Sequence, residues 1–369
     1  MRRPVWDCPD EVSAVNLDLT ETQRLMQESL GGFLEAHVSL DQVRDLERNQ
    51  GWDKALWKKL AEQGWLELVI RDGCEGADLV DLSLAVECLS RRAALVPFME
   101  VAVCSRVLRA SDADGATRSK IAEGDLVVTP ALLEAVDDWN RIEAKVTSAG
   151  RLSGAKHFVD YGAEATHHLV AAKQDGEMGL FLVDANNARC EPLKTIGRTP
   201  SCQATYEAVP AERVAGEEAF IDMILLGRSL AALQCVGAME EALEKTVQYA
   251  RLREQFGQPI GRFQAVRHHC SDMAIRIASS RDLCFEAISA LQAGNRDPLR
   301  PAAAKASASR AAPEVLMLAH QIHGGNGVIE ENDLYFFTLR GKERSLAWGT
   351  VDECLEVIGE RVDQPVDWL

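Results

Sequence analysis

The sequence predicts an α+β protein in which a β domain lies between two helical domains. Three observations indicate this order: apolar residues recur at helical spacing from about 18 to 125, short segments separated by turn residues follow from about 126 to 220, and helical spacing returns from 221. We therefore predict an N-terminal helical domain at 1–125, a middle β-barrel or sandwich domain at 126–220, and a C-terminal four-helix bundle at 221–369.

The N-terminal region carries recognisable helix signals. Thr20, with Gln23 three residues later, forms a capping-box pattern at a helix start. The stretch 52–65 has helical apolar spacing and contains Gly64, a residue typical of helix ends. A further periodic stretch runs from 79 to 89. These signals predict at least three helices before the β domain.

The middle and C-terminal regions differ in segment length. Strands are predicted at 126–128, 141–146, 168–172 and 180–183, with turns at Gly150, Gly154, Gly162 and 175–176. After residue 221 a helix of several turns extends to about Ala250, a second begins near Phe263, and an alanine-rich third follows Pro301. This change from short to long segments is typical of a β domain followed by a bundle.

Composition excludes several classes of function. The net charge of −17 argues against a nucleic-acid-binding protein, which needs clustered cations. No apolar run approaches the ~20 residues of a membrane span, and no signal peptide is indicated. The ten cysteines include no CxxC pair, and His268, His269 and His323 do not form a metal set, so no metal site is predicted. We expect free thiols and a cytoplasmic protein.

Two glycine-containing motifs stand in the third region. Residues 253–264 read REQFGQPIGRFQ, and residues 321–327 read QIHGGNG. Either alone is explained by a turn or by a glycine at a helix end. In this order, within an α-β-α chain, they resemble the two signatures of the acyl-CoA dehydrogenases, flavoenzymes that oxidise the α,β bond of CoA thioesters. The resemblance covers essentially the whole chain, is strong from 221 to 350 and is weak from 126 to 165.

The resemblance implies that the protein binds FAD at a subunit interface. In the family, the matching residues hold the adenine and diphosphate end of an FAD that lies mainly in the neighbouring subunit. Arg253 is suited to a charge-assisted contact with the diphosphate, and glycine lets backbone approach a ligand closely. The predicted cofactor-binding residues are Arg253, Gln255, Phe256, Gln264, Gln321, Gly324, Gly325 and Thr350.

The catalytic base that the resemblance implies is missing. Family members supply a Glu either from a Glu-Gly-Thr triplet, here Trp348-Gly349-Thr350, or from the residue before an Arg in the first C-terminal helix, here Gly227-Arg228. An indole cannot accept a proton at neutral pH. We therefore predict no catalytic residue in this chain, and Arg228 as a substrate-binding residue. Nearby carboxylates that could replace the base, more simply interpreted as solvated charges, are Glu330, Glu331, Glu343 and Asp352.

The middle domain also departs from the family at its flavin motifs. Thr129-Pro130-Ala131 and Val136-Asp137-Asp138 stand where the family has Thr-Glu-Pro and Gly-Ser-Asp. In the third motif, Phe158 replaces a Trp, and Asp160 replaces the Thr that would meet flavin N5. An anionic Asp160 there would oppose hydride arrival. Either the flavin site has diverged and still binds FAD, or it has been lost.

These features lead to one main hypothesis and two alternatives. The chain looks like the non-catalytic subunit of the heterotetrameric acyl-CoA dehydrogenases of bacterial steroid side-chain degradation. Its expected partners are a paralogous subunit that carries the Glu, a bulky acyl-CoA substrate, and electron-transfer flavoprotein as acceptor. The alternatives are an active homo-oligomeric enzyme with a relocated base, and a flavin-free binding or assembly protein on the same fold.

Overall fold

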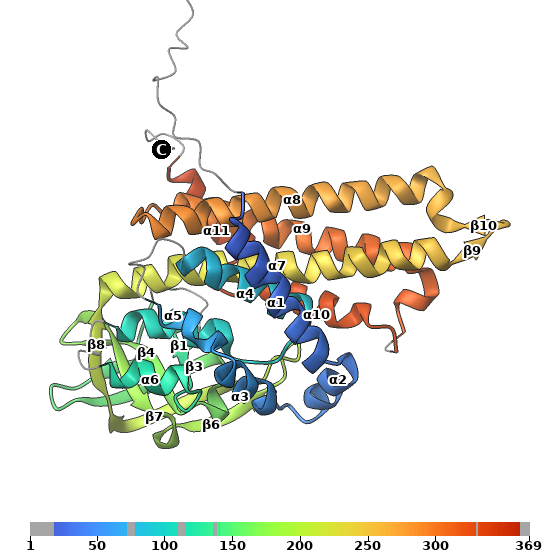
Figure 1. Cartoon of the computed structure of the whole chain (residues 1–369). Helices are drawn as coiled ribbons and strands as arrows, with labels where there is room; N and C mark the ends of the chain where they lie inside the picture. Colours follow the sequence, from blue (N-terminus) through green and yellow to red (C-terminus); the bar gives the residue numbers. More distant parts are fainter. Residues whose placement is uncertain are drawn as a thin grey trace, which may run out of the picture.

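The computed structural model describes residues 18–71, 78–109, 115–135, 139, 141–329 and 331–361. Figure 1 shows the long C-terminal helices in one layer and the sheet beneath them, with the N-terminal helices reaching from the bundle to the sheet. The order of helices, then strands, then helices confirms the predicted fold class.

The N-terminal part consists of short helices. They are α1 (Glu21–His37), α2 (Leu40–Arg48), α3 (Lys54–Glu62), the 3₁₀ turn η1 (Trp65–Val69), α4 (Asp78–Arg91), α5 (Phe98–Leu108) and α6 (Ala116–Ala122). The capping box of Thr20 and Gln23 is present at the start of α1. Gly64 lies after α3 with φ +76°, a conformation that favours glycine. Because nearly every residue of α5 is buried, this helix lies between the sheet and the bundle.

The middle part is one eight-stranded sheet. Its strands are β1 (Val128–Ala131), β2 (Lys145–Val146), β3 (Arg151–Asp160), β4 (His167–Gln174), β5 (Glu177–Asp184), β6 (Arg189–Leu193), β7 (Ser201–Pro210) and β8 (Glu212–Gly216). The order is β6-β7-β3-β2-β4-β5-β8, and β1 pairs in parallel with β4. The 3₁₀ turns η2 (Gly162–Glu164) and η3 (Ala185–Asn187) connect strands. The predicted strand at 141–146 shortens to β2, since the Glu134 carboxylate accepts the amides of Glu143 and Ala144 at 2.8 and 3.0 Å.

The C-terminal part is a helix bundle. It contains α7 (Glu217–Leu252), the hairpin strands β9 (Glu254–Gln255) and β10 (Gln258–Pro259), the 3₁₀ turn η4 (Ile260–Arg262), α8 (Gln264–Gln292), α9 (Leu299–His323), η5 (Gly324–Gly327), α10 (Leu334–Leu346) and α11 (Val351–Gly359). Within the described residues, α7 alone has the length and composition of a membrane span. Its most apolar window is 78% buried inside the protein, as the central helix of a bundle would be.

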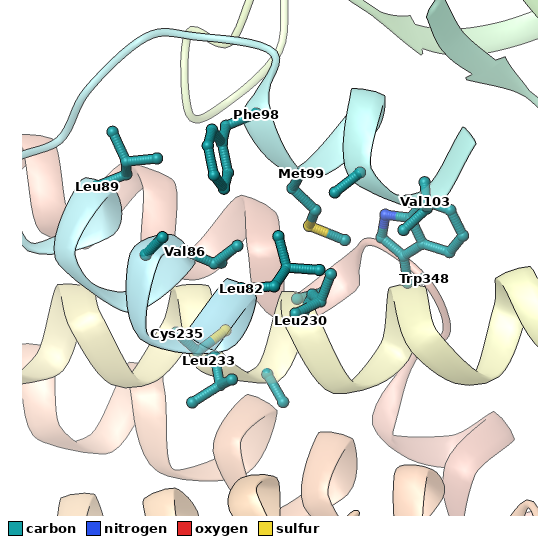
Figure 2. Packing of buried hydrophobic residues seen from close by; sticks show 14 of the residues in the cluster. Leu82, Val86, Leu89, Phe98, Met99, Val103, Leu230, Leu233, Cys235 and Trp348 are labelled. Carbon is teal, nitrogen blue, oxygen red and sulfur yellow. The ribbon is translucent and has the colours of Figure 1, made fainter. Parts of the chain in front are cut away.

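The main hydrophobic core joins the N-terminal helices to the bundle, and a second core lies within the sheet. Figure 2 shows part of the main core, formed by Leu82 and Val86 of α4, Met99 and Val103 of α5, Leu230 of α7, and Trp348. Trp348, which stands where the resemblance implies a catalytic Glu, is therefore a core residue.

Candidate active-site cleft and cofactor surface

A cleft of about 400 Å³ lies where the sheet, α5 and the end of α10 meet. This volume is within the usual range for a small-molecule site. Its walls are mainly apolar, with a charged group at one side. The lining residues used below are Glu100, Leu132, Trp139, Phe158, Asp160, Glu343, Arg344, Trp348 and Thr350.

Trp348 and Gly227, the two base positions, lie against each other. A Cβ built on Gly227 would overlap the six-membered ring of the Trp348 indole. That indole is 8% exposed and stacks on Trp139, with ring centroids 6.1 Å apart. The space that a catalytic carboxylate would occupy from either position is therefore filled by one indole, and only glycine at 227 leaves room for it.

Arg228 fixes the backbone beneath this indole. Its Nε donates to the Trp348 carbonyl at 3.1 Å, and a Cβ on Gly349 would lie 3.1 Å from the same nitrogen. Trp348 has φ +61° and Gly349 has φ +111°, so the chain turns sharply here. Arg228 is buried and is not among the described residues that line the cleft. The structure thus shows Arg228 bonded to the Trp348 backbone, and its contact with a substrate stays a prediction.

The charged wall of the cleft is centred on Arg344, which sequence reasoning missed. Its guanidinium donates to Asp160 and to Thr199 Oγ1, both at 2.9 Å. Glu343 lies 3.4 Å away and Glu100 3.9 Å away. Asp160 therefore has a cationic partner that the sequence did not indicate, an arginine 184 residues further along the chain.

Burial changes the acidity of this group. It raises the pKa of Glu100 to about 7, with Arg344 opposing the shift and Asp160 adding to it. It also raises the pKa of Asp160, again against the pull of Arg344. Desolvation penalises the charged form of each carboxyl, and one guanidinium is shared among three of them. Near neutral pH, Glu100 can therefore hold or release a proton.

Strand β3, which the resemblance places beside a flavin ring, forms hydrogen bonds with the preceding loop. Lys156 donates from Nζ to the Leu132 carbonyl at 3.0 Å and to Glu134 at 2.7 Å. The His157 amide donates to the Leu133 carbonyl at 2.9 Å. Together with the Asp160–Arg344 ion pair, these bonds give the polar groups of Lys156, His157 and Asp160 partners within the protein. Residues 136–138, which belong to the second flavin motif, lie outside the described residues.

The other candidate carboxylates do not complete a site. Glu343 lines the cleft but accepts a hydrogen bond from the Gly197 amide at 2.6 Å and contacts Arg344. Glu331 and Asp352 are exposed, and Glu330 lies outside the described residues. Thr350 lines the cleft, and its hydroxyl caps α11 through the amide of Glu353. Within the described ranges, no three His, Cys, Asp or Glu side chains gather as metal ligands.

The first signature lies at the opposite end of α7. Arg253 follows Gly227 by 26 residues along this helix, which at 1.5 Å per residue corresponds to about 39 Å. Arg253, Gln255 and Phe256 are exposed, and Phe256 retains 91% of its accessible surface at the tip of the β9–β10 hairpin. Figure 1 shows this hairpin projecting from the end of the bundle that lies far from the sheet.

The second signature reaches the same end. Tyr249, one turn before Arg253, stacks on His323 with ring centroids 4.3 Å apart. Gln321, Gly324 and Gly325 are exposed, and a Cβ on either glycine would meet nothing within 4 Å. Gly324 has φ +59°, which favours glycine there.

The start of α8 adds open amide groups to this end. Its N-cap residue, Phe263, makes no side-chain cap, and the exposed Gln264 begins the helix. Helix N-termini favour phosphates because their first amides lack partners and the helix dipole is positive there. The cation, the open glycines and this helix start fit the diphosphate end of a dinucleotide. The structure therefore brings Arg253, Gln264, Gln321, Gly324 and Gly325 to one surface, and leaves Thr350 at the cleft.

Two family models match the chain. "Acyl-CoA dehydrogenase, N-terminal domain" matches residues 20–112, and "Acyl-CoA dehydrogenase, C-terminal domain" matches residues 215–362. Acyl-CoA dehydrogenase IpdE2 of Mycobacterium tuberculosis is 27% identical over 329 residues, which span 87% of this chain and 91% of that protein. Acyl-CoA dehydrogenase FadE27 of the same organism is 26% identical over 377 residues, which span 94% and 99%.

Solved structures agree with this match. A variant of the Tcur3481-Tcur3483 steroid ACAD superposes with a TM-score of 0.85 at 29% identity, over 92% of this chain and 97% of that chain. The ChsE4-ChsE5 complex from Mycobacterium tuberculosis superposes with a TM-score of 0.85 at 25% identity, over 95% and 99%. Similarity at this level extends over all three parts of the fold.

Proposed function

This chain belongs to the acyl-CoA dehydrogenase family, and we propose that it is the non-catalytic subunit of a heteromeric, FAD-dependent acyl-CoA dehydrogenase. It contributes the adenine and diphosphate half of an FAD site to a partner that carries the catalytic Glu. One observation carries the proposal: the indole of Trp348 lies on Gly227 and fills both base positions, while the surface around Arg253 stays exposed about 39 Å away.

The chemistry of the reaction explains why the filled base position matters. Removal of the proton α to a thioester carbonyl needs a positioned base, and an indole N–H is only a donor. When bound, FAD supplies the hydride acceptor. In the proposed complex this chain binds and orients: Arg253 pairs with the diphosphate, Gln264 and Gln321 offer amides, and Gly324 and Gly325 let the cofactor approach the backbone.

The expected partners follow from the family and from the relatives. The ChsE4-ChsE5 structure is of a complex of two named chains, and the Tcur3481-Tcur3483 structure is of a steroid ACAD. We propose a heterotetramer of two unlike pairs, a bulky and steroid-like acyl-CoA as substrate, and electron-transfer flavoprotein as acceptor. Loss of one site in each pair leaves room for a large acyl group. The location proposed is the cytoplasm.

Co-expression with a base-bearing paralogue tests the proposal. The isolated chain should be colourless and should not turn over any CoA thioester with an artificial electron acceptor. The mixed complex should be yellow and active. A yellow, active isolated chain would contradict the proposal. A mixed complex that contains no flavin would instead favour the flavin-free assembly protein.

Two observations favour a second candidate, an active enzyme with a relocated base. Glu100 lines the cleft with a pKa raised to about 7, which suits a general base. The Nε1 of Trp139, also on the cleft wall, is a buried donor without a hydrogen-bond partner. Turnover by the isolated chain that disappears in Glu100→Gln would support this candidate. Absence of turnover in both proteins would exclude it.

A further inference from the structure

The proposed half-site is built from two chain segments that each need support. Arg253 follows the last turn of α7, and Gly324–Gly325 follows the last turn of α9. Both segments are exposed, and helix ends have fewer backbone hydrogen bonds than helix interiors. A diphosphate held between a guanidinium and backbone amides requires a fixed distance between them. Some contact beneath the surface must therefore set the spacing of the two helix ends.

One aromatic pair joins the two ends. The rings of Tyr249 and His323 stack with centroids 4.3 Å apart and an interplanar angle of 19°. The Tyr249 hydroxyl also lies 3.5 Å from the His323 carbonyl oxygen, where it can donate. His323 is buried and Tyr249 is half-buried, so the pair lies just under the exposed glycines. Such a stack adds directional stability beyond the apolar area that it buries.

Tyr249 is coupled to Arg253 through the backbone. The Arg253 amide donates to the Tyr249 carbonyl at 2.8 Å, and the Arg253 carbonyl accepts the Ile260 amide at 2.8 Å. The returning chain passes so close to α7 that a Cβ on Gly261 would lie 3.0 Å from the Ala250 carbonyl oxygen. A shift of Tyr249 would therefore move Arg253 and the hairpin with it.

His323 is coupled to the glycines in a similar way. Its Nδ1 donates to the Ala319 carbonyl at 2.9 Å, which fixes the ring on α9. A Cβ on Gly327 would lie 2.8 Å from the His323 Cβ, so η5 packs directly on this residue. His320 adds a hydrogen bond from Nδ1 to the Gly327 carbonyl at 2.8 Å. The position of the His323 ring thus determines where Gly324 and Gly325 lie.

We infer that Tyr249 and His323 are positioning residues for the FAD half-site, and that their stacked rings set the distance between Arg253 and the Gly324–Gly325 backbone. This inference rests on the proposed function. Neither ring needs to touch the cofactor, so their effect is on FAD affinity and not on the chemical step. No local feature of either signature identifies the pair, because its two members lie 74 residues apart.

The test is an FAD titration of the mixed complex after removal of its flavin. Tyr249→Leu removes the stack and should weaken FAD binding about threefold to tenfold, with turnover at saturating FAD unchanged. Tyr249→Phe keeps a stacked ring and should bind FAD within about twofold of the wild type. Phe33→Leu is the matched control, since it disrupts another ring–histidine stack, with His37, at 4.4 Å in α1. It should leave FAD affinity unchanged.

ADP provides a second measurement that does not depend on the partner or on activity. Ligand-observed NMR of the isolated chain should show ADP contacts that weaken in Tyr249→Leu and persist in Tyr249→Phe. Wild-type FAD affinity in Tyr249→Leu would overturn the inference, and so would an equal loss in Tyr249→Phe. If Arg253→Ala weakens FAD binding while Tyr249→Leu does not, only the positioning role fails. If neither variant weakens it, the proposed function fails as well.

Discussion

The predicted functional positions are buried at one end of α7 and exposed at the other. At the cleft end, the positions that would carry catalysis have become core: Trp348 is buried and packs on Gly227. At the hairpin end, the positions that would bind a neighbour's cofactor stay exposed, and Phe256 projects into solvent. Packing in the core fixes a buried side chain such as Trp348, whereas an exposed side chain can contact a partner molecule. Under the proposed function, the cleft end of α7 lacks the catalytic base, and the hairpin end keeps the cofactor surface.

The packing at positions 227 and 348 disfavours the return of a carboxylate base. A side chain at 227 requires the indole at 348 to leave, and a carboxylate at 348 would enter a buried site next to the Asp160, Glu100 and Glu343 carboxyls. We therefore expect that a single substitution at either position does not restore a working base. For the same reason, we expect Trp348→Glu alone to yield neither a flavin-loaded nor an active homo-oligomer.

Removal of the indole should have the largest effect on stability. Trp348→Ala leaves a cavity in the main core and should lower the free energy of unfolding by about 3–5 kcal/mol. Denaturant unfolding of the isolated chain measures this. Phe158→Ala is the control, because Phe158 lines the same cleft but is 61% exposed, and it should cost less than about 1 kcal/mol. Equal losses in the two variants would show that Trp348 is not a core residue.

The charged wall of the cleft should make stability depend on pH. The pKa of Glu100 is about 7 in the folded state, above its ordinary value, so the folded protein holds a proton there that the unfolded chain releases. The stabilising contribution is complete below pH ~4.5 and is lost as pH rises through 7, amounting to about 3 kcal/mol. Glu100→Gln should flatten this part of the stability profile between pH 5 and 8. Parallel profiles for the two proteins would contradict the assignment.

Because Gly227 and Trp348 are in contact, the stability effects of substitutions at the two positions should be non-additive. Gly227→Ala should cost about 1–3 kcal/mol of stability, because the added methyl overlaps the indole. The same change in a Trp348→Ala background should be neutral or stabilising. Gly32→Ala in α1, where a Cβ meets nothing within 4 Å, should stabilise by about 0.5–1 kcal/mol. Additive effects of the Gly227 and Trp348 changes would show that the two positions do not touch.

At the hairpin end of α7, substitution of Arg253 should lower FAD affinity and leave the stability of the fold nearly unchanged. Arg253→Ala should weaken FAD binding by the mixed complex about tenfold to a hundredfold, as expected for loss of a charge-assisted contact with phosphate. Stability should change by less than about 0.5 kcal/mol. Arg251→Ala is the control, since it removes another exposed cation, in the last turn of α7. A similar loss in both variants would indicate only a general effect of charge.

The sequence predicted the order of the fold and the start of α1, because capping and periodicity are local signals. It also identified Trp348 and Gly227, since both are counted from short signatures. It could not reveal that the two residues touch, that Arg344 pairs with Asp160, or that Arg228 bonds the Trp348 carbonyl. Each of these contacts joins residues more than a hundred positions apart, and no local pattern reports such pairs.

The shortened strand β2 has a similar cause. The alternation at 141–146 predicts a longer strand, but the Glu134 side chain accepts the amides of Glu143 and Ala144. A side chain in a preceding loop thus replaces a strand partner. The residue pattern within 141–146 does not show that a side chain elsewhere takes the hydrogen bonds of these amides.

The number of FAD molecules in the mixed complex tests the central claim most directly. The complex would be purified by gel filtration, its flavin released by denaturation, and the flavin counted against each chain. If this chain serves only its partner's cofactor, the count is one FAD for each pair of unlike chains. Two FAD molecules for each pair would show that the cleft beside Trp348 still holds a flavin, and would contradict the division between the two ends of α7.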